Sequence, residues 1–448
     1  MILAFAGPSW KPTAPGNQTG PLLVVLDAGW SAAPDWPARV TRAEAALTDA
    51  AAQGRPAALL LADGHPAPGA LPFAPADTLL AGLRAAQPVS WSTGLPDDPA
   101  ATLAAVPEGQ LSTLWISDGL DHPDRAAWLA DALQAQGCEV AGFAVPREPD
   151  TDLVAQGIRA AQGAQVVVAL GGGAVIDAGK AVAALVPATR PMLDHLEVVG
   201  RGLPLDHPPL PFVAIPTTAG TGAEVTRNAV IGVPDHRRKV SLRDARMLPR
   251  LAVVDPALTD GCPRPVTLAS GLDAITQVIE PFVCTRANPL TDALCRDAIP
   301  RGLAAIRRLM EVEDAEARDE MAWVSLCGGL ALANAGLGAV HGLAGPLGGL
   351  TGAPHGAICG ALLPPVLMMN RHAAIDPGAI ERLDQVARWI GAAFDTPFAS
   401  MPEAVRALAD WSHRAGLPAL TALGIGPEAQ AAAEAQRLAM ADSAVQEA

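Results

Sequence analysis

The sequence predicts an α/β fold that leads into an all-α domain. Strand-like apolar runs alternate with Ala-rich helical stretches up to about residue 185, an order that is typical of parallel sheets. A run of three glycines at 171–173 joins one of these strands to a helix. Beyond about residue 262, the apolar residues recur at helical spacing. Because 448 residues are many for one core, we expect about two or three domains.

The α/β pattern divides into two successive segments. In residues 1–112, strands are predicted at 22–27 and 57–63, with helices at 38–53 and 76–86. The second segment, 113–261, has strands predicted at 113–118, 139–145, 165–173, 212–216 and 251–255. Strand 113–118 fits either sheet, so the junction between the two segments lies between about 113 and 140.

The third segment, 262–448, is predicted to be mainly helical. Its apolar-periodic stretches are 264–282, 289–310, 315–335, 357–369, 376–394, 402–415 and 427–445. An α/β layer of the kind that binds nucleotides therefore leads into a helical domain.

Charge and cysteine content limit the partners of the chain. The formal charge of −15 and the pI near 5.0 argue against nucleic acid and against an anionic membrane surface. The six cysteines lack paired C-x-x-C spacing, so neither a disulfide framework nor a zinc ribbon is indicated. The apolar start is shorter than a membrane helix and lacks a basic flank. We expect a soluble cytoplasmic protein whose partners are small molecules.

The glycine loop predicts a phosphate site. Glycines at the start of a helix let an anion approach the backbone, and the helix dipole favours negative charge there. A second cluster of small and hydroxyl residues, PTTAGTGAEVT at 216–226, could close over phosphate or ribose. The alternative is a tight turn that binds no ligand. Asp118, at the end of its predicted strand, could accept from ribose hydroxyls and favour NAD, or it could cap the next helix.

A separate group of residues predicts a metal site. In a helical interpretation of 269–282, Asp273, Gln277 and Glu280 fall on one face at i, i+4 and i+7. His341 and His355 lie in apolar, Gly-rich sequence, where buried imidazoles need partners. One carboxylate and two imidazoles supply three ligands to a divalent cation and leave a position for a substrate oxygen. Taken singly, each histidine is more often a hydrogen-bonded core residue, and only the three residues together favour a metal site.

Residues 113–445 resemble the iron-containing (group III) alcohol dehydrogenases. The resemblance lies in GGGAVIDAGK, PTTAGTGAEVT, DPALT, SGLDAITQVIEP and GAVHGLAGPLGG followed by PHGAICGALLP. It implies a Rossmann-like dinucleotide-binding layer, a helical domain with Fe²⁺ or Zn²⁺ in the cleft between them, NAD as cofactor and assembly into a homo-oligomer. It assigns the metal to Asp273, His341 and His355, and the cofactor to Asp118, Gly172, Gly173, Asp177, Thr217, Thr218 and Lys239.

The sequence departs from this family's pattern at several positions, among them Ala174, which replaces a frequent serine after the glycines. Gln277 stands where many members have a fourth, histidine ligand, and it could offer an amide oxygen to the metal or hold a water. Gly345 stands where many members have a histidine near the nicotinamide, so no catalytic acid or base is assigned. Glu280 is interpreted as structural.

The first 110 residues resemble a bacterial von Willebrand A-like domain instead. GPLLVVLDAGWSAAPDW is similar to its first metal loop, with Asp27, Gly29 and Ser31 in place of the usual D-x-S-x-S. LWISDGLDH is similar to its later T-D-G loop. The chain is therefore interpreted as a fusion of two domain types.

The predicted function is a metal-dependent alcohol dehydrogenase that transfers hydride between an alcohol or aldehyde and NAD. One alternative is a reductase of the maleylacetate type with a degenerate metal site, which would keep its activity after metal removal. Another is a non-enzymatic von Willebrand A-like interaction module with an inactive dehydrogenase part, which would not bind NADH saturably.

Overall fold

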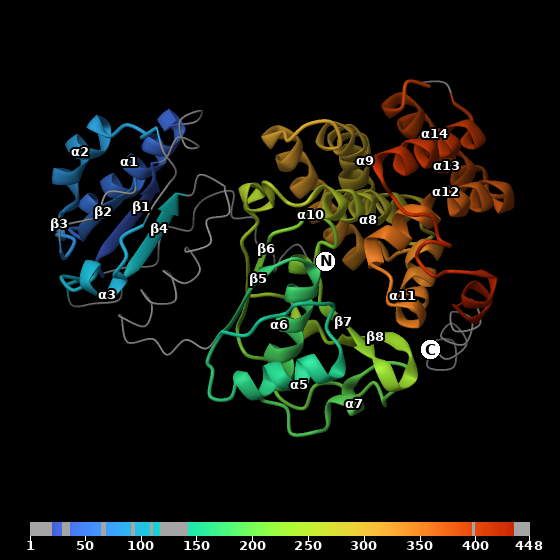
Figure 1. The fold of residues 1–448 in the computed structure, drawn as a ribbon, viewed down its shortest axis with the longest axis horizontal. Helices are drawn as coiled ribbons and strands as arrows, with labels where there is room; N and C mark the ends of the chain where they lie inside the picture. Colours follow the sequence, from blue (N-terminus) through green and yellow to red (C-terminus); the bar gives the residue numbers. More distant parts are fainter. Residues whose placement is uncertain are drawn as a thin grey trace. The chain divides into compact units, whose positions relative to one another are not determined.

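The computed structural model describes residues 20–28, 36–63, 69–90, 95–107, 111–116, 142–396 and 399–433. The chain forms two compact units that divide near residue 142 (Figure 1). Each unit is described by itself.

The N-terminal unit is built on a sheet with the strand order β3-β2-β1-β4. The central strand β1 (Leu22–Asp27) pairs in parallel with β2 (Pro56–Ala62) and β4 (Ser112–Ile116), and the short β3 (Ala74–Pro75) runs antiparallel to β2. A continuous apolar run such as LLVVL is typical of a strand that is buried on both faces.

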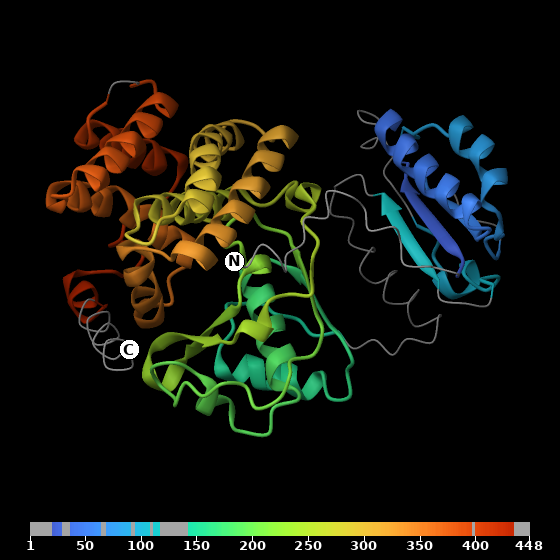
Figure 2. The same ribbon diagram turned by 180° about the vertical axis from the view of Figure 1, so that it is seen from behind.

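Both faces of β1 are indeed covered. Leu22, Val24 and Leu26 pack into a cluster with the helix α1 (Trp36–Ala52) and the short α2 (Leu80–Ala85), which Figure 2 shows in blue on one side of the sheet. Leu23 and Val25 point to the other face, where a second cluster includes residues around α3 (Pro99–Thr102). The predicted α/β character of this segment is confirmed.

The pairing of β4 differs from the expected domain boundary at 112/113. Leu22 aligns with Ser112 and Leu26 with Ile116, so this strand belongs to the N-terminal sheet. Asp118 follows it and lies outside the described residues, as do Gly29 and Ser31. Residues 142–145, expected to complete a strand, have no regular secondary structure.

The second unit begins with a parallel three-stranded sheet in the order β5-β6-β9. Its strands are β5 (Val167–Gly171), β6 (Phe212–Pro216) and β9 (Leu251–Ala252). The helices of this layer are α5 (Thr151–Ala160), α6 (Gly173–Leu185) and the short α7 (Met192–His195), and a hairpin is formed by β7 (Asn228–Val233) and β8 (Arg238–Arg243).

Close packing of α6 against the sheet depends on a small residue. A β-carbon on Gly179 would lie 2.8 Å from the side chains of Ala169 and Phe212. Since real β-carbons do not approach that closely, only glycine lets α6 lie this near β5 and β6. This contact sets the position of the helix start that follows the glycine loop.

The rest of the unit is helical, as predicted. The helices are α8 (Arg264–Val283), α9 (Pro289–Leu309), α10 (Ala315–Ala335), α11 (Ala339–Thr351), α12 (His355–Ala373), α13 (Pro377–Ala393) and α14 (Met401–Ala415). Side chains of Asn288, Asp314 and Asp376 cap α9, α10 and α13, which explains where these helices begin.

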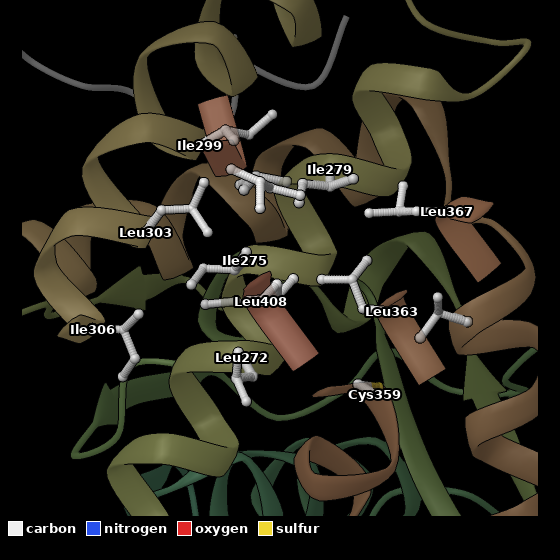
Figure 3. Packing of buried hydrophobic residues seen from close by; sticks show 14 of the residues in the cluster. Leu272, Ile275, Ile279, Ile299, Leu303, Ile306, Cys359, Leu363, Leu367 and Leu408 are labelled. Carbon is white, nitrogen blue, oxygen red and sulfur yellow. The ribbon is translucent and has the colours of Figure 1, made fainter. Parts of the chain in front are cut away.

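Helix α8 forms the centre of this domain. It lies among α9, α10 and α12 (Figure 1), and its residues Leu272, Ile275 and Ile279 pack against apolar side chains of the neighbouring helices (Figure 3). Polar side chains on such a helix are buried and need partners.

The helix α11 was not expected, because its sequence is rich in glycine and contains Pro346. Tertiary packing of Val340, Ala344 and Leu347 into the core overrides the poor helix propensity.

Among the described residues, no single helix has the length and hydropathy of a membrane span. One pair of helices, α10 and α11, reaches this length and hydropathy only when both are taken together, and the pair is bent by 102°.

Candidate metal and cofactor site

Three helices bring the predicted metal ligands together. Asp273 lies in the middle of α8 and is 2% exposed, His341 lies in the first turn of α11, and His355 is the first residue of α12. The Nε2 atoms of His341 and His355 are 3.3 Å and 3.8 Å from Oδ1 of Asp273. The three side chains, far apart in the sequence, therefore surround one point.

The atoms that face this point lack partners of their own. Oδ1 of Asp273 and Nε2 of His341 are buried, yet neither has a hydrogen-bond partner among the described residues. An unsatisfied buried polar atom costs about 1–3 kcal/mol, and two at one place indicate a ligand that satisfies both. Ligands at about 2.0–2.1 Å from a tetrahedral cation lie about 3.3 Å apart. The carboxylate and imidazoles fit a divalent cation.

Glu280 holds His341 in the orientation that this site needs. Its Oε2 lies 2.7 Å from Nδ1 of His341, and its Oε1 accepts a 2.7 Å hydrogen bond from the backbone N–H of Val340. A proton on Nδ1 that is donated to Glu280 leaves the lone pair on Nε2 free to face Asp273. Sequence reasoning placed Glu280 on the correct helix face but missed this role.

We expect that Glu280→Ala weakens Zn²⁺ binding about 10–100-fold, because His341 loses the acceptor that selects its tautomer. Competition against a chromophoric chelator measures the affinity. Glu316→Ala is the matched control, because that carboxylate is 77% exposed on α10. Equal affinities of the Glu280 variant and the control would contradict the positioning role.

The electrostatics of the cluster favour positive charge. Burial raises the pKa of the Asp273 carboxyl, but His355 and His341 outweigh burial and hold this pKa below its usual value. Burial lowers the pKa of His355, whereas Cys359 and Asp273 raise it to about 9. Burial also lowers the pKa of His341, but Cys359, Asp273 and Glu280 together raise it well above its usual value. The same acidic neighbours that stabilise protonated histidines would stabilise a bound metal cation.

The two predicted cofactor loops lie against each other. The backbone N–H of Thr217 donates to the carbonyl of Gly171 at 3.0 Å. A β-carbon on Gly172 would lie 3.2 Å from Oγ1 of Thr218, and one on Gly173 would lie 2.7 Å from the Thr221 side chain. Any larger residue at Gly173 would push the loops apart, so this helix start requires glycine. The backbone at the N-terminus of α6 is suited to a phosphate.

Gln277 connects these loops to the metal-binding helix. Its Nε2 donates a 2.7 Å hydrogen bond to the carbonyl of Thr221, and its side chain is buried against Gly328. The amide nitrogen is therefore committed to the loop, and only the amide oxygen is left for the metal or a water. Whether it serves as a ligand stays a prediction.

Asp177, expected at the cofactor, bridges α6 to the hairpin. Its Oδ2 accepts from the backbone N–H of Val230 at 3.1 Å, and its Oδ1 lies 3.5 Å from Nζ of Lys180. Burial raises the pKa of this carboxyl, while Lys180 and, more weakly, His355 lower it. Asp177 thus lies within electrostatic reach of the metal cluster.

The remaining predicted positions have different surroundings. Lys239 on β8 forms an ion pair with Glu148, and its Nζ lies beside Gly348 of α11. Gly345, one turn after His341, borders open space: among the described residues, a β-carbon there would meet no atom within 4 Å. Cys359, which sequence reasoning did not select, joins the metal group. Its position one turn after His355 was the available signal.

A sheet with a glycine loop, joined to helices that converge on a carboxylate and two imidazoles, defines a metal-binding oxidoreductase that uses a dinucleotide. The chain belongs to the iron-containing alcohol dehydrogenase family. The family model for iron-containing alcohol dehydrogenase matches residues 108–256, and the model for the C-terminal part of the Fe-containing family matches 267–448.

Named relatives agree with this membership. A 4-hydroxybutyrate dehydrogenase of Cupriavidus necator is 36% identical over 294 residues, which are 63% of this chain and 74% of the relative. A lactaldehyde reductase of Escherichia coli (strain K12) is 36% identical over 247 residues, 54% of this chain and 64% of the relative. The matches thus span only part of each relative.

Solved structures show the same fold. A 1,3-propanediol oxidoreductase has a TM-score of 0.58 at 30% identity and covers 68% of this chain and 79% of its own. A sulfoacetaldehyde reductase from Bifidobacterium kashiwanohense, solved in complex with NAD⁺, has a TM-score of 0.57 at 26% identity, with coverage of 68% and 80%.

Proposed function

We propose that this protein is a metal-dependent alcohol dehydrogenase that transfers hydride between a small alcohol or aldehyde and NAD. The observation that carries this proposal is the convergence of Asp273, His341 and His355, where Oδ1 of Asp273 and Nε2 of His341 are buried without hydrogen-bond partners among the described residues. Relatives named for alcohol, hydroxy-acid and aldehyde substrates support the substrate class.

Each group of residues has a distinct part in this reaction. Asp273, His341 and His355 would hold Fe²⁺ or Zn²⁺, which supplies Lewis acidity that lowers the pKa of an alcohol. Glu280 keeps the Nε2 lone pair of His341 directed at the site. The open space at Gly345 leaves room for substrate beside the cluster.

The glycine loop of the α/β layer would bind the cofactor. The N-terminus of α6 at Gly172 and Gly173 favours the pyrophosphate, with Thr217 and Thr218 alongside. The hydrogen bond from Gln277 to the carbonyl of Thr221 links the second cofactor loop to the metal-binding helix α8. This contact fixes the position of the loop against the helix. Asp118 as a ribose acceptor, Asp177 and Lys239 as cofactor contacts, a homo-oligomeric assembly and a cytoplasmic location belong to the same proposal.

We also propose that the N-terminal unit is von Willebrand A-like. The order β3-β2-β1-β4, with only β3 antiparallel, supports this, because β1 and β4 then end at the same edge of the sheet. Asp27 is the last residue of β1 at that edge. Loops that follow these two strands are the ones that resemble the metal loops of such domains.

NADH titration and metal analysis of the full chain test the enzymatic proposal. We expect a saturable change in NADH fluorescence, and alcohol oxidation that stops on chelation and returns with Fe²⁺ or Zn²⁺. Gly173→Leu, whose side chain would collide with Thr221, should lose NADH binding but keep its metal. Activity that survives complete metal removal would favour the reductase, and a flat titration would favour an inert module.

A further inference from the structure

We propose that Cys359 is a fourth metal ligand, as a thiolate, and that the site therefore selects Zn²⁺ over Fe²⁺. This inference deepens the proposed function and rests on it. Asp273, His341, His355 and Cys359 each offer a ligand atom, and these four atoms all lie within 4.8 Å of one another.

The position of Cys359 on α12 explains how its sulfur reaches the site. His355 and Cys359 are one helical turn apart and share a face of α12. Figure 3 shows Cys359 at the end of the packed apolar cluster, one turn before Leu363. Its side chain is fully buried, so the sulfur lies where the apolar core ends and the polar cluster begins.

The separations match those of ligands on one ion. With Zn–N near 2.0–2.1 Å and Zn–S near 2.3 Å, tetrahedral geometry places nitrogen and sulfur about 3.5 Å apart. The observed distance between Sγ of Cys359 and Nε2 of His355 is 3.5 Å. Oδ1 of Asp273 and Nε2 of His341 are buried, lie 3.3 Å from each other and have no hydrogen-bond partner in the part of the chain that the structure describes. The sulfur therefore occupies a ligand position around an otherwise unsatisfied centre.

The side-chain amide of Gln277 is a weaker candidate than the sulfur of Cys359 for the fourth ligand position. Gln277 has committed its nitrogen to the carbonyl of Thr221, and an amide oxygen is a weaker ligand than thiolate for Zn²⁺. One thiolate and one carboxylate also neutralise a dication, which favours an ion in a site as buried as this one. With four protein ligands, a substrate oxygen would have to be a fifth one, and catalytic zinc sites sometimes expand to five ligands.

Metal selectivity follows from the softness of sulfur. Two imidazoles and a carboxylate accept Fe²⁺ and Zn²⁺ alike, whereas thiolate ligands select zinc. The competing interpretation is a core thiol that remains protonated and only contacts His355 through an S–H···N hydrogen bond. The two interpretations differ in whether a metal–sulfur bond forms, and spectroscopy detects that bond directly.

Titration of chelator-treated, reduced full-length protein with Co²⁺ alone provides the test. When Co²⁺ binds, the Cys359 thiol releases its proton to solvent as the sulfur–cobalt bond forms. We expect a thiolate-to-cobalt charge-transfer band in the near ultraviolet, together with visible ligand-field bands. Cys359→Ser should lose the near-ultraviolet band and bind Zn²⁺ at least about 10-fold more weakly. Cys327→Ser is the matched control, because Cys327 is a fully buried thiol on α10 outside the metal group.

Each outcome decides between the interpretations. A charge-transfer band that disappears only in Cys359→Ser supports the thiolate ligand. Visible bands without the near-ultraviolet band, or a spectrum that Cys359→Ser leaves unchanged, would overturn the ligand assignment and leave the proposed function standing. Failure of the wild-type protein to bind Co²⁺ would overturn both.

Discussion

Asp273→Ala is expected to abolish metal binding and alcohol turnover together. Its Oδ1 lies 3.3 Å from Nε2 of His341 and 3.8 Å from Nε2 of His355, so its removal takes away the carboxylate that the two imidazoles share. We expect metal affinity to fall more than about 100-fold, beyond the effect of losing a group that only orients a ligand. Elemental analysis of the purified protein and steady-state oxidation of a primary alcohol measure the two losses.

A matched variant separates this effect from general damage. Asp410→Ala removes an exposed carboxylate from α14 and should leave metal content and turnover unchanged. Asp273→Asn keeps the size of the side chain and should still lose most of the metal, because a neutral amide binds a divalent cation more weakly. A variant at 273 that retains a full equivalent of metal would refute the site.

Lys180→Met is expected to lower the free energy of unfolding by about 3–5 kcal/mol. Its ammonium is fully buried and donates to the carbonyl of Ala223 at 2.8 Å, to Oγ1 of Thr226 at 3.0 Å and to the carbonyl of Asn228 at 2.5 Å. Asp177 lies 3.5 Å away. Methionine fills the volume of the lysine but leaves these acceptors and the Asp177 carboxylate without a cation. Removing one partner of a buried ion pair is strongly destabilising, because the other charge stays buried and uncompensated.

Urea unfolding followed by circular dichroism measures this loss. Lys239→Met serves as the comparison, because its ion pair with Glu148 is partly exposed and should contribute about 1 kcal/mol or less. Similar losses for both variants would show that the buried ammonium has no special role. Because Lys180 holds the end of the second cofactor loop through Ala223 and Thr226, we also expect its replacement to weaken NADH binding.

The order of α/β and helical segments could be predicted from local pattern alone. Strand runs such as 22–27 and helices such as 264–283 have apolar spacing that matches one secondary structure and not the other. Helix α11 escaped prediction, because glycine-rich sequence has no helical preference and only burial of Val340 and Leu347 stabilises it. The sequence also did not predict which sheet strand 112–116 joins, because its apolar run is compatible with either sheet.

Some residues of the metal site could be predicted from the sequence, whereas the roles of others were visible only in the structure. Residue type and motif were sufficient to select Asp273, His341 and His355, because few roles suit a carboxylate and two imidazoles in apolar surroundings. The same sequence placed Glu280 on the helix face of Asp273 and Cys359 one turn after His355, but it did not show which groups these two side chains contact. Their roles depend on how α11 and α12 are placed against α8, which local periodicity does not encode.

By itself, then, the sequence determined the residue types, the faces of individual helices and the identity of the glycine loops. Tertiary structure alone decided that Glu280 orients His341, that Gln277 is bound to Thr221 and that a sulfur lies 3.5 Å from His355. The reason is physical: side-chain chemistry is local, whereas contacts between helices are set by packing of the whole core.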